Sequence, residues 1–159
     1  MNITILAVGK VKESFYREAL SEYQKRLGRY CHLEIVEVAD EPVPEKASPA
    51  EEELIKEREA KRILKRLREN SFVITLEITG KKLDSEKFAK KLEDLALARK
   101  SQLVFVIGGS LGLHASVSAQ ADLKLSFSDL TFPHQLMRVI LAEQIYRAFR
   151  IISGAPYHK

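Results

Sequence analysis

The chain has 159 residues, of which 45% are apolar, and this is enough to bury the core of one domain. We expect that single domain to span residues 1–159. The 26 Lys and Arg against 22 Asp and Glu leave a net charge of only +4. This balance excludes an acidic disordered tail and a highly basic arm, but it allows a folded protein with one basic face for nucleic acid.

Cysteine usage and the N-terminus indicate where the protein works. The single cysteine, Cys31, cannot form an internal disulfide, and one Cys with four His does not make a cysteine-rich zinc site. A reducing, cytoplasmic location fits this usage. The apolar N-terminus has no basic region and reaches Gly9 after eight residues, which is typical of a strand and too short for a signal peptide. No apolar run approaches the roughly 20 residues of a membrane span. We therefore expect no metal and no membrane contact.

Strands and helices are predicted to alternate along the chain. In chain order we expect a strand over 2–8, a helix over 14–28, a strand over 33–38, a helix over 50–69, a strand over 72–78, a helix over 84–98, a strand over 103–107, a short helix near 115–121, a strand over 123–127 and a helix over 134–152. Three prolines between residues 42 and 49 predict a loop there. The alternation indicates an α/β fold with a mostly parallel sheet and helices on both faces. The uninterrupted apolar run 103–107 is typical of a central strand.

The helix predicted over 50–69 is densely charged. Its acidic residues gather near the N-terminal end and its basic residues near the C-terminal end, as the helix dipole favours. The simpler interpretation is a solvated helix face, and the alternative is a surface that contacts RNA.

The ends of three predicted strands are candidates for a ligand site, because open α/β sheets bind ligands outside the carboxyl ends of their strands. These ends are the segments 76–80, 108–112 and 127–133. The pair Gly108-Gly109 either lets backbone N–H groups approach a ligand or forms only a tight turn. The sequence contains neither a P-loop nor a Gly-x-Gly-x-x-Gly after the first strand, which argues against both ordinary nucleotide sites.

The last predicted helix is apolar on every side, which predicts that one side packs against a second subunit. His134 and Arg138 lie one turn apart on it, and Glu143 and Arg147 have the i,i+4 spacing of an ion pair. These are either paired interface groups or members of an active site that straddles a dimer interface.

The C-terminal tail carries an aromatic ring and an imidazole side by side, in Tyr157 and His158. Chain ends are usually neutral to function. A tyrosine next to a histidine is nevertheless suited to stacking on a base and moving a proton.

Several runs of residues match one known family. They are Ile5 to Lys10, Gly108 to Leu113, Ser126 to His134, Arg138 to Ala148 and the terminal Pro156-Tyr157-His158-Lys159. In these runs, and in total length, the chain resembles the RlmH family. Its members are SPOUT-class methyltransferases that methylate N3 of a pseudouridine in a stem-loop of 23S rRNA.

The resemblance implies a fold, a cofactor and a partner. The fold would have a C-terminal trefoil knot, and the protein would be a homodimer with the knot at its interface. The cofactor would be S-adenosyl-L-methionine, whose methyl group is electrophilic without a metal. The residues that match the family's cofactor site lie in the three strand-end segments above: Leu76, Gly108, Phe127, Ser128, Asp129, Leu130, Thr131 and Phe132.

The resemblance also suggests catalytic roles. N3 of the base must lose a proton, and His158 and Tyr157 are the candidates for the base or proton relay, reaching across from the partner subunit. Arg138 would stabilise negative charge on the carbonyl oxygens of the base or hold a phosphate. His134 and Glu143 would orient these groups. With a net charge of +4 and no accessory RNA-binding domain, the enzyme is expected to bind isolated RNA weakly and to act on the assembled ribosome.

Two other functions remain open on the residues alone. One is a non-catalytic ribosome- or RNA-binding module with the same fold. The other is a small-molecule α/β enzyme that uses His134 or His158 on a phosphorylated ligand. A lysine at the glycine turn would favour the second, and none is present.

Overall fold

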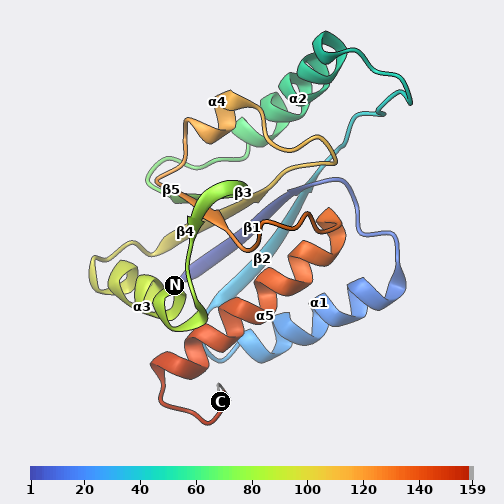
Figure 1. The fold of residues 1–159 in the computed structure, drawn as a ribbon. Coiled ribbons are helices and arrows are strands. Elements are labelled where there is room, and N and C mark those ends of the chain that lie inside the picture. Colours follow the sequence, from blue (N-terminus) through green and yellow to red (C-terminus); the bar gives the residue numbers. More distant parts are fainter. Residues whose placement is uncertain (158–159) are drawn as a thin grey trace.

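Five parallel strands form the sheet at the centre of the fold, in the order β2-β1-β4-β3-β5 (Figure 1). The computed structural model describes residues 1–157. In chain order the elements are β1 (Asn2–Val8), α1 (Ser14–Leu27), β2 (His32–Val38), α2 (Pro49–Leu64), β3 (Phe72–Lys82), α3 (Ser85–Leu97), β4 (Gln102–Ile107), α4 (Ala115–Ser118), β5 (Leu123–Ser126) and α5 (His134–Ile152).

The predicted α/β fold with a parallel sheet is confirmed, and so is the central place of the apolar strand. β4 lies between β1 and β3, and every residue from Leu103 to Ile107 is buried. Such a strand has no solvent-facing side, because helices cover both faces of a parallel sheet.

The helices form two layers, one on each face of the sheet. α1, α3 and α5 cover one face, and α2 with the short α4 covers the other (Figure 1). The alternation of side chains along β1 produces two separate cores: Ile3 and Ile5 pack beneath the first layer, whereas Leu6 and Val8 pack beneath the second.

Helix α5 has the bounds that the sequence predicts, and every residue from His134 to Ile151 is at least partly buried. It lies between α1 and α3 on the sheet, and contacts both (Figure 1). Packing within one chain therefore accounts for much of its apolar character, so that character does not by itself require a second subunit.

Helix α2 is shorter than predicted, since it ends at Leu64 instead of reaching residue 69. Its start is well defined: Ser48 accepts a hydrogen bond from the Glu51 amide, and the Glu51 carboxylate accepts one from the Ser48 amide. After Leu64 the chain tightens into three-residue turns, and Asn70 takes a positive φ of 66° that redirects it into β3. The basic residues after Leu64 thus lie in a turn.

Strand β3 is longer than predicted, because Gly80 lies inside the strand instead of after it. The register between β3 and β5 shifts, so that Leu125 pairs with both Leu76 and Lys81. A Cβ on Gly80 would lie 2.8 Å from the backbone of Leu125, so glycine is required for this close approach. The bulge moves residues 77–80 out of the ladder, at the end of the sheet where the site lies.

The close approach at Gly80 predicts a stability cost for any side chain there. Gly80→Ala is expected to lower the free energy of unfolding by about 1–3 kcal/mol, the usual range for overpacking. Urea denaturation measures this. Gly28→Ala is the matched control, because Gly28 has a right-handed helical conformation (φ −55°) that alanine adopts readily. Equal stability of the two variants would contradict the close contact.

Candidate functional site

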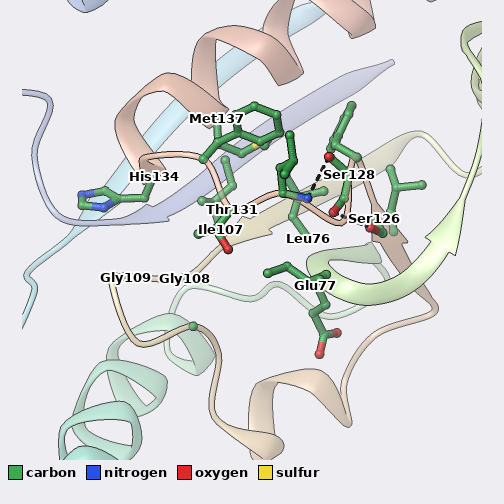
Figure 2. Close-up of a pocket in the computed structure, with 16 residues that line it drawn as sticks. Leu76, Glu77, Ile107, Gly108, Gly109, Ser126, Ser128, Thr131, His134 and Met137 are labelled. Atoms are coloured by element: carbon green, nitrogen blue, oxygen red, sulfur yellow. Dashed lines mark hydrogen bonds between the residues drawn. The ribbon is translucent and has the colours of Figure 1, made fainter.

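The carboxyl ends of β3, β4 and β5 open into one pocket (Figure 2). Its lining comes from all three strand-end segments singled out in the sequence, together with the first turn of α5. The lining residues are Leu76, Glu77, Ile78, Ile107, Gly108, Gly109, Gly112, Leu125, Ser126, Phe127, Ser128, Leu130, Thr131, Phe132, His134 and Met137. Parallel strands bring these segments together because their carboxyl ends meet at one edge of the sheet.

Of the eight residues predicted to bind a cofactor, all but Asp129 line this pocket. The side chain of Asp129 is instead 78% exposed, and its carboxylate forms a salt bridge of 2.6 Å with Lys82 Nζ. Asp129 therefore joins the loop after β5 to the end of β3 from outside the pocket.

The loop after β5 is held in shape by its own hydrogen bonds. The hydroxyl of Ser126 donates to the carbonyl of Ser128, and the Ser128 hydroxyl accepts from the amide of Leu130 at 2.9 Å (Figure 2). These bonds turn the loop back on itself, and so shape one wall of the pocket before any ligand binds.

The glycine loop after β4 forms the opposite wall. The Gly112 amide donates to the Gly109 carbonyl, and a Cβ on Gly108 would lie 2.8 Å from the Gly112 backbone. The tight turn, one of the two explanations offered by the sequence, therefore accounts for Gly108 by itself. A Cβ on Gly109 would meet the buried carboxylate of Glu59 at 3.0 Å.

The pocket is also lined by the ionisable residues Glu77, to which no role was assigned from the sequence, and His134, which was expected to orient the catalytic groups. Glu77 accepts hydrogen bonds from the hydroxyls of Thr75 (2.5 Å) and Ser118 (2.8 Å). His134 lines the pocket at the start of α5, and burial, followed by the charge of Arg138, lowers its pKa below the ordinary value of 6.5. The His134 imidazole is therefore neutral at pH 7.

Arg138 lies on the inner side of α5, where its side chain is fully buried. Its guanidinium donates to Glu37 Oε1 (2.9 Å) and to the carbonyls of Val8 (2.8 Å) and Gly9 (2.9 Å). The predicted contact of Arg138 with a base or a phosphate does not fit this placement, because the group is enclosed by protein. Arg138 instead fixes the start of α5 to the ends of β1 and β2.

Glu37 is the partner that sequence reasoning missed. It accepts from the Val11 amide (3.1 Å) as well as from Arg138, so one carboxylate organises the chain after β1. One indication of this role was present in the sequence, since Glu37 is a charged residue next to the carboxyl end of a largely apolar strand. Only the fold could show that Arg138, 101 residues later, would reach it.

Two other predicted catalytic residues, Glu143 and Tyr157, lie together beside the second half of α5. Glu143 Oε1 accepts from Arg147 (2.6 Å), which confirms the predicted ion pair, and from the Tyr157 hydroxyl (3.2 Å). The guanidinium of Arg147 also lies over the Tyr157 ring, 4.8 Å from its centroid. His158 lies outside the described residues.

The surroundings of Tyr157 favour the protonated form of its phenol. Burial, followed by the carboxylate of Glu143, raises the pKa of the Tyr157 phenol. Tyr157 therefore keeps its proton at neutral pH and donates a hydrogen bond to Glu143, and its predicted place in a proton relay stays a prediction.

Within one chain, Glu143, Arg147 and Tyr157 stay apart from the pocket. Glu143 follows His134 by nine residues on α5, which corresponds to about 13 Å along the helix axis. None of Glu143, Arg147 and Tyr157 lines the pocket.

The comparisons with known proteins agree on a family. A family model described as "Predicted SPOUT methyltransferase" matches residues 1–158. The chain belongs to the SPOUT methyltransferase family. The match confirms the SPOUT class expected from the sequence.

Relatives of this SPOUT methyltransferase cover its whole length. It is 60% identical to the putative ribosomal RNA large subunit methyltransferase H of Methanococcus maripaludis, over 100% of both chains. It is 56% identical to the ribosomal RNA large subunit methyltransferase H of Clostridium beijerinckii, again over 100% of both. The predicted resemblance to the RlmH family is thereby confirmed.

A solved structure shares the fold. A probable methylase family protein from Haemophilus influenzae superimposes with a TM-score of 0.56 at 15% identity, covering 99% of this chain and 70% of the other.

The pocket suits the cofactor that SPOUT methyltransferases generally use, S-adenosylmethionine. Apolar side chains such as Leu76 and Ile107 and the exposed backbone of two tight loops offer a slot for a flat base with hydrogen-bonding edges. Among residues 1–157 no group of three or more His, Cys, Asp or Glu could hold a metal ion, and no helix is long and apolar enough to cross a membrane.

The ion pair between the buried Arg138 and the partly exposed carboxylate of Glu37 makes a prediction about stability. Glu37→Gln is expected to destabilise the fold by about 2 kcal/mol or more, because it leaves the charge of Arg138 buried without a counter-ion. Glu34→Gln on the same strand is the control, since the partner of Glu34, Arg68 at 3.9 Å, is itself exposed and keeps its contact with water. Chemical denaturation compares the two. Similar midpoints would show that the ion pair does not fix α5.

The lowered pKa of His134 makes a prediction about pH. A histidine whose pKa is depressed by folding stabilises the protein above its unfolded pKa of about 6.5, and this contribution is lost as pH falls through the folded value. His134→Gln should therefore lose less thermal stability than the wild type between pH 7.5 and 5.5. The carboxylates of Asp40 and Glu13 oppose the shift. The exposed His32→Gln control should follow the wild type, and a His134→Gln profile parallel to the wild type would refute the shift.

Proposed function

We propose that this protein transfers a methyl group from S-adenosylmethionine to N3 of a pseudouridine in a stem-loop of 23S rRNA, on assembled ribosomes in the cytoplasm. It would act as a homodimer of single-domain chains (residues 1–159), each with a C-terminal trefoil knot. The observation that carries the proposal is the pocket at the carboxyl ends of β3, β4 and β5, in a chain whose full-length relatives bear an rRNA methyltransferase name.

The two tight loops would hold the cofactor. Leu76, Gly108 and the run Phe127 to Phe132 present apolar surface and backbone groups to the pocket, apart from Asp129, whose salt bridge with Lys82 supports the loop from outside. When bound, S-adenosylmethionine supplies an electrophilic methyl group on a sulfonium. The pocket is lined mainly by apolar side chains, which exclude water from the transfer.

The proton on N3 needs an acceptor. On methylation, the proton that leaves N3 would pass to the imidazole of His158. Tyr157 donates a hydrogen bond and stacks, while Glu143 positions its hydroxyl. His134, neutral at the pocket, orients the base, and Arg138 acts as a positioning residue through its bonds to β1 and β2.

A second subunit would complete the site. Tyr157 does not line the pocket of its own chain, and we therefore propose that the next residue, His158, acts at the partner's pocket. Side chains on the outer side of α5, such as Leu136, Val139 and Ile140, remain partly exposed and would be covered by that contact.

This mechanism predicts that cofactor binding and methyl transfer can be separated. His158→Ala should lower methyl transfer to ribosomes by about 100-fold or more, and Tyr157→Phe by less, while the affinity for S-adenosylmethionine stays near that of the wild type. Mass spectrometry of rRNA measures the first and isothermal titration calorimetry the second. Lys159→Ala serves as the control. Equal losses of methyl transfer and of cofactor affinity would contradict the assignment of His158 and Tyr157 to the transfer step.

Mixed dimers test whether the tail acts in trans. Gly108→Val should destroy the pocket, because even a Cβ there meets the Gly112 backbone. Mixing the Gly108→Val protein with the His158→Ala protein should restore part of the activity. In each heterodimer the intact pocket of the His158→Ala subunit then meets the intact tail of the Gly108→Val subunit. No recovery in mixtures shown to contain heterodimers would place the tail at its own pocket.

A further inference from the structure

A basic and aromatic groove lies between the C-terminal ends of α1 and α5, away from the pocket. We define it as the Arg–Tyr groove by its lining residues: Glu22, Lys25, Arg26, Arg29, Tyr30, Tyr146 and Arg150. We propose that the Arg–Tyr groove binds the phosphodiester backbone of the substrate RNA. The proposal rests on the function proposed above, because it names the surface by which the same enzyme holds its RNA.

The first argument is charge. Four cations line the groove against one carboxylate, Glu22, whose single salt bridge within the described residues is an exposed one with Arg26. Among residues 1–157 no acidic side chain forms a salt bridge with Lys25 or Arg29, both of which are exposed. Unpaired cations at a concave surface attract phosphate groups.

The dipoles of α1 and α5 account for only part of the positive charge in the groove. The C-terminal ends of α1 and α5 both point here, and each carries about half a negative charge that favours nearby cations. Lys25, Arg26 and Arg150 suit that need. Arg29, however, lies beyond the end of α1, and four full charges exceed two half charges and one carboxylate by about two units. That excess is available to a ligand.

Aromatic rings distinguish RNA from a simple anion. The Tyr146 ring lies beneath the guanidinium groups of Arg26 (5.8 Å) and Arg150 (5.9 Å), and Tyr30 stacks on Phe149 at 5.5 Å. Cations interleaved with aromatic rings are the usual construction of a surface for single-stranded nucleic acid, since rings stack on bases while cations bind the backbone.

The position of the groove fits a role in substrate delivery. Tyr146 contacts Tyr157, with ring centroids 5.0 Å apart, so the groove adjoins the residues proposed to meet the target base. RNA bound in the groove would therefore run toward the tail that acts on it.

The experiment compares two matched double variants of the full-length protein. Lys25→Gln/Arg29→Gln removes two unpaired cations from the groove. Lys65→Gln/Arg66→Gln removes the same types of residue beyond the end of α2, where both are exposed and, among residues 1–157, form no salt bridge. A labelled RNA stem-loop is titrated at several salt concentrations, with polyglutamate as a second probe.

We expect the groove variant to weaken RNA binding by about tenfold and to lower the slope of log K against log salt by about 1.5–2, since each lost phosphate contact removes about 0.7–0.9. The control variant should keep the wild-type slope. Wild-type affinity in the groove variant, or equal losses in both variants, would overturn the proposal. Equally tight binding of polyglutamate would replace RNA by an acidic peptide, and a change in oligomeric state would make the groove a subunit contact.

Two further measurements separate this inference from the proposed function. If the wild type methylates ribosomes but the groove variant binds RNA normally, the groove assignment fails and the function stands. If no methyl transfer occurs but RNA binding depends on Lys25 and Arg29, the function fails and the groove stands.

Discussion

The buried guanidinium of Arg138 holds together the parts of this fold that form the pocket. It joins the start of α5 to the backbone carbonyls of Val8 and Gly9 at the end of β1 and to Glu37 on β2, and it is completely buried. A buried cation is tolerated only with such partners, so the start of α5 has one stable position. The loop before α5 and His134 at its first turn are placed by the same contact, and with them one wall of the pocket.

From this anchor, α5 separates two kinds of chemistry. Its start carries the pocket, where apolar side chains and tight loops suit a cofactor. Its second half carries Glu143 and Arg147, which contact Tyr157 from the segment after the helix, beside the Arg–Tyr groove, where charge and aromatic rings suit a nucleic acid. The nine residues from His134 to Glu143 keep these two regions about 13 Å apart along the helix axis within one chain. The proposed dimer, in which one chain's tail acts at its partner's pocket, is the arrangement that would join them.

Much of the candidate site was predictable because strand ends are visible in a sequence. An apolar run followed by Gly108-Gly109 marks a buried strand and the turn after it, and parallel strands necessarily bring such ends together. The details were not predictable, since they depend on contacts between distant residues. Glu37 pairs with Arg138 across 101 residues, Gly80 lies inside β3 because Leu125 passes close by, and Asp129 faces Lys82 instead of the pocket.

The sequence by itself determined the alternation of elements, the central strand and the family, because hydrophobic periodicity and contiguous motifs are local properties. The tertiary structure alone decided what the polar residues of α5 do. Helical periodicity shows on which face of α5 Arg138 and Glu143 lie, but not which residues of other elements they contact. In the folded chain Arg138 is buried and anchors the helix, whereas Glu143 accepts a hydrogen bond from Tyr157. The modest net charge of +4 likewise conceals the Arg–Tyr groove, whose cations come together only where the ends of α1 and α5 converge.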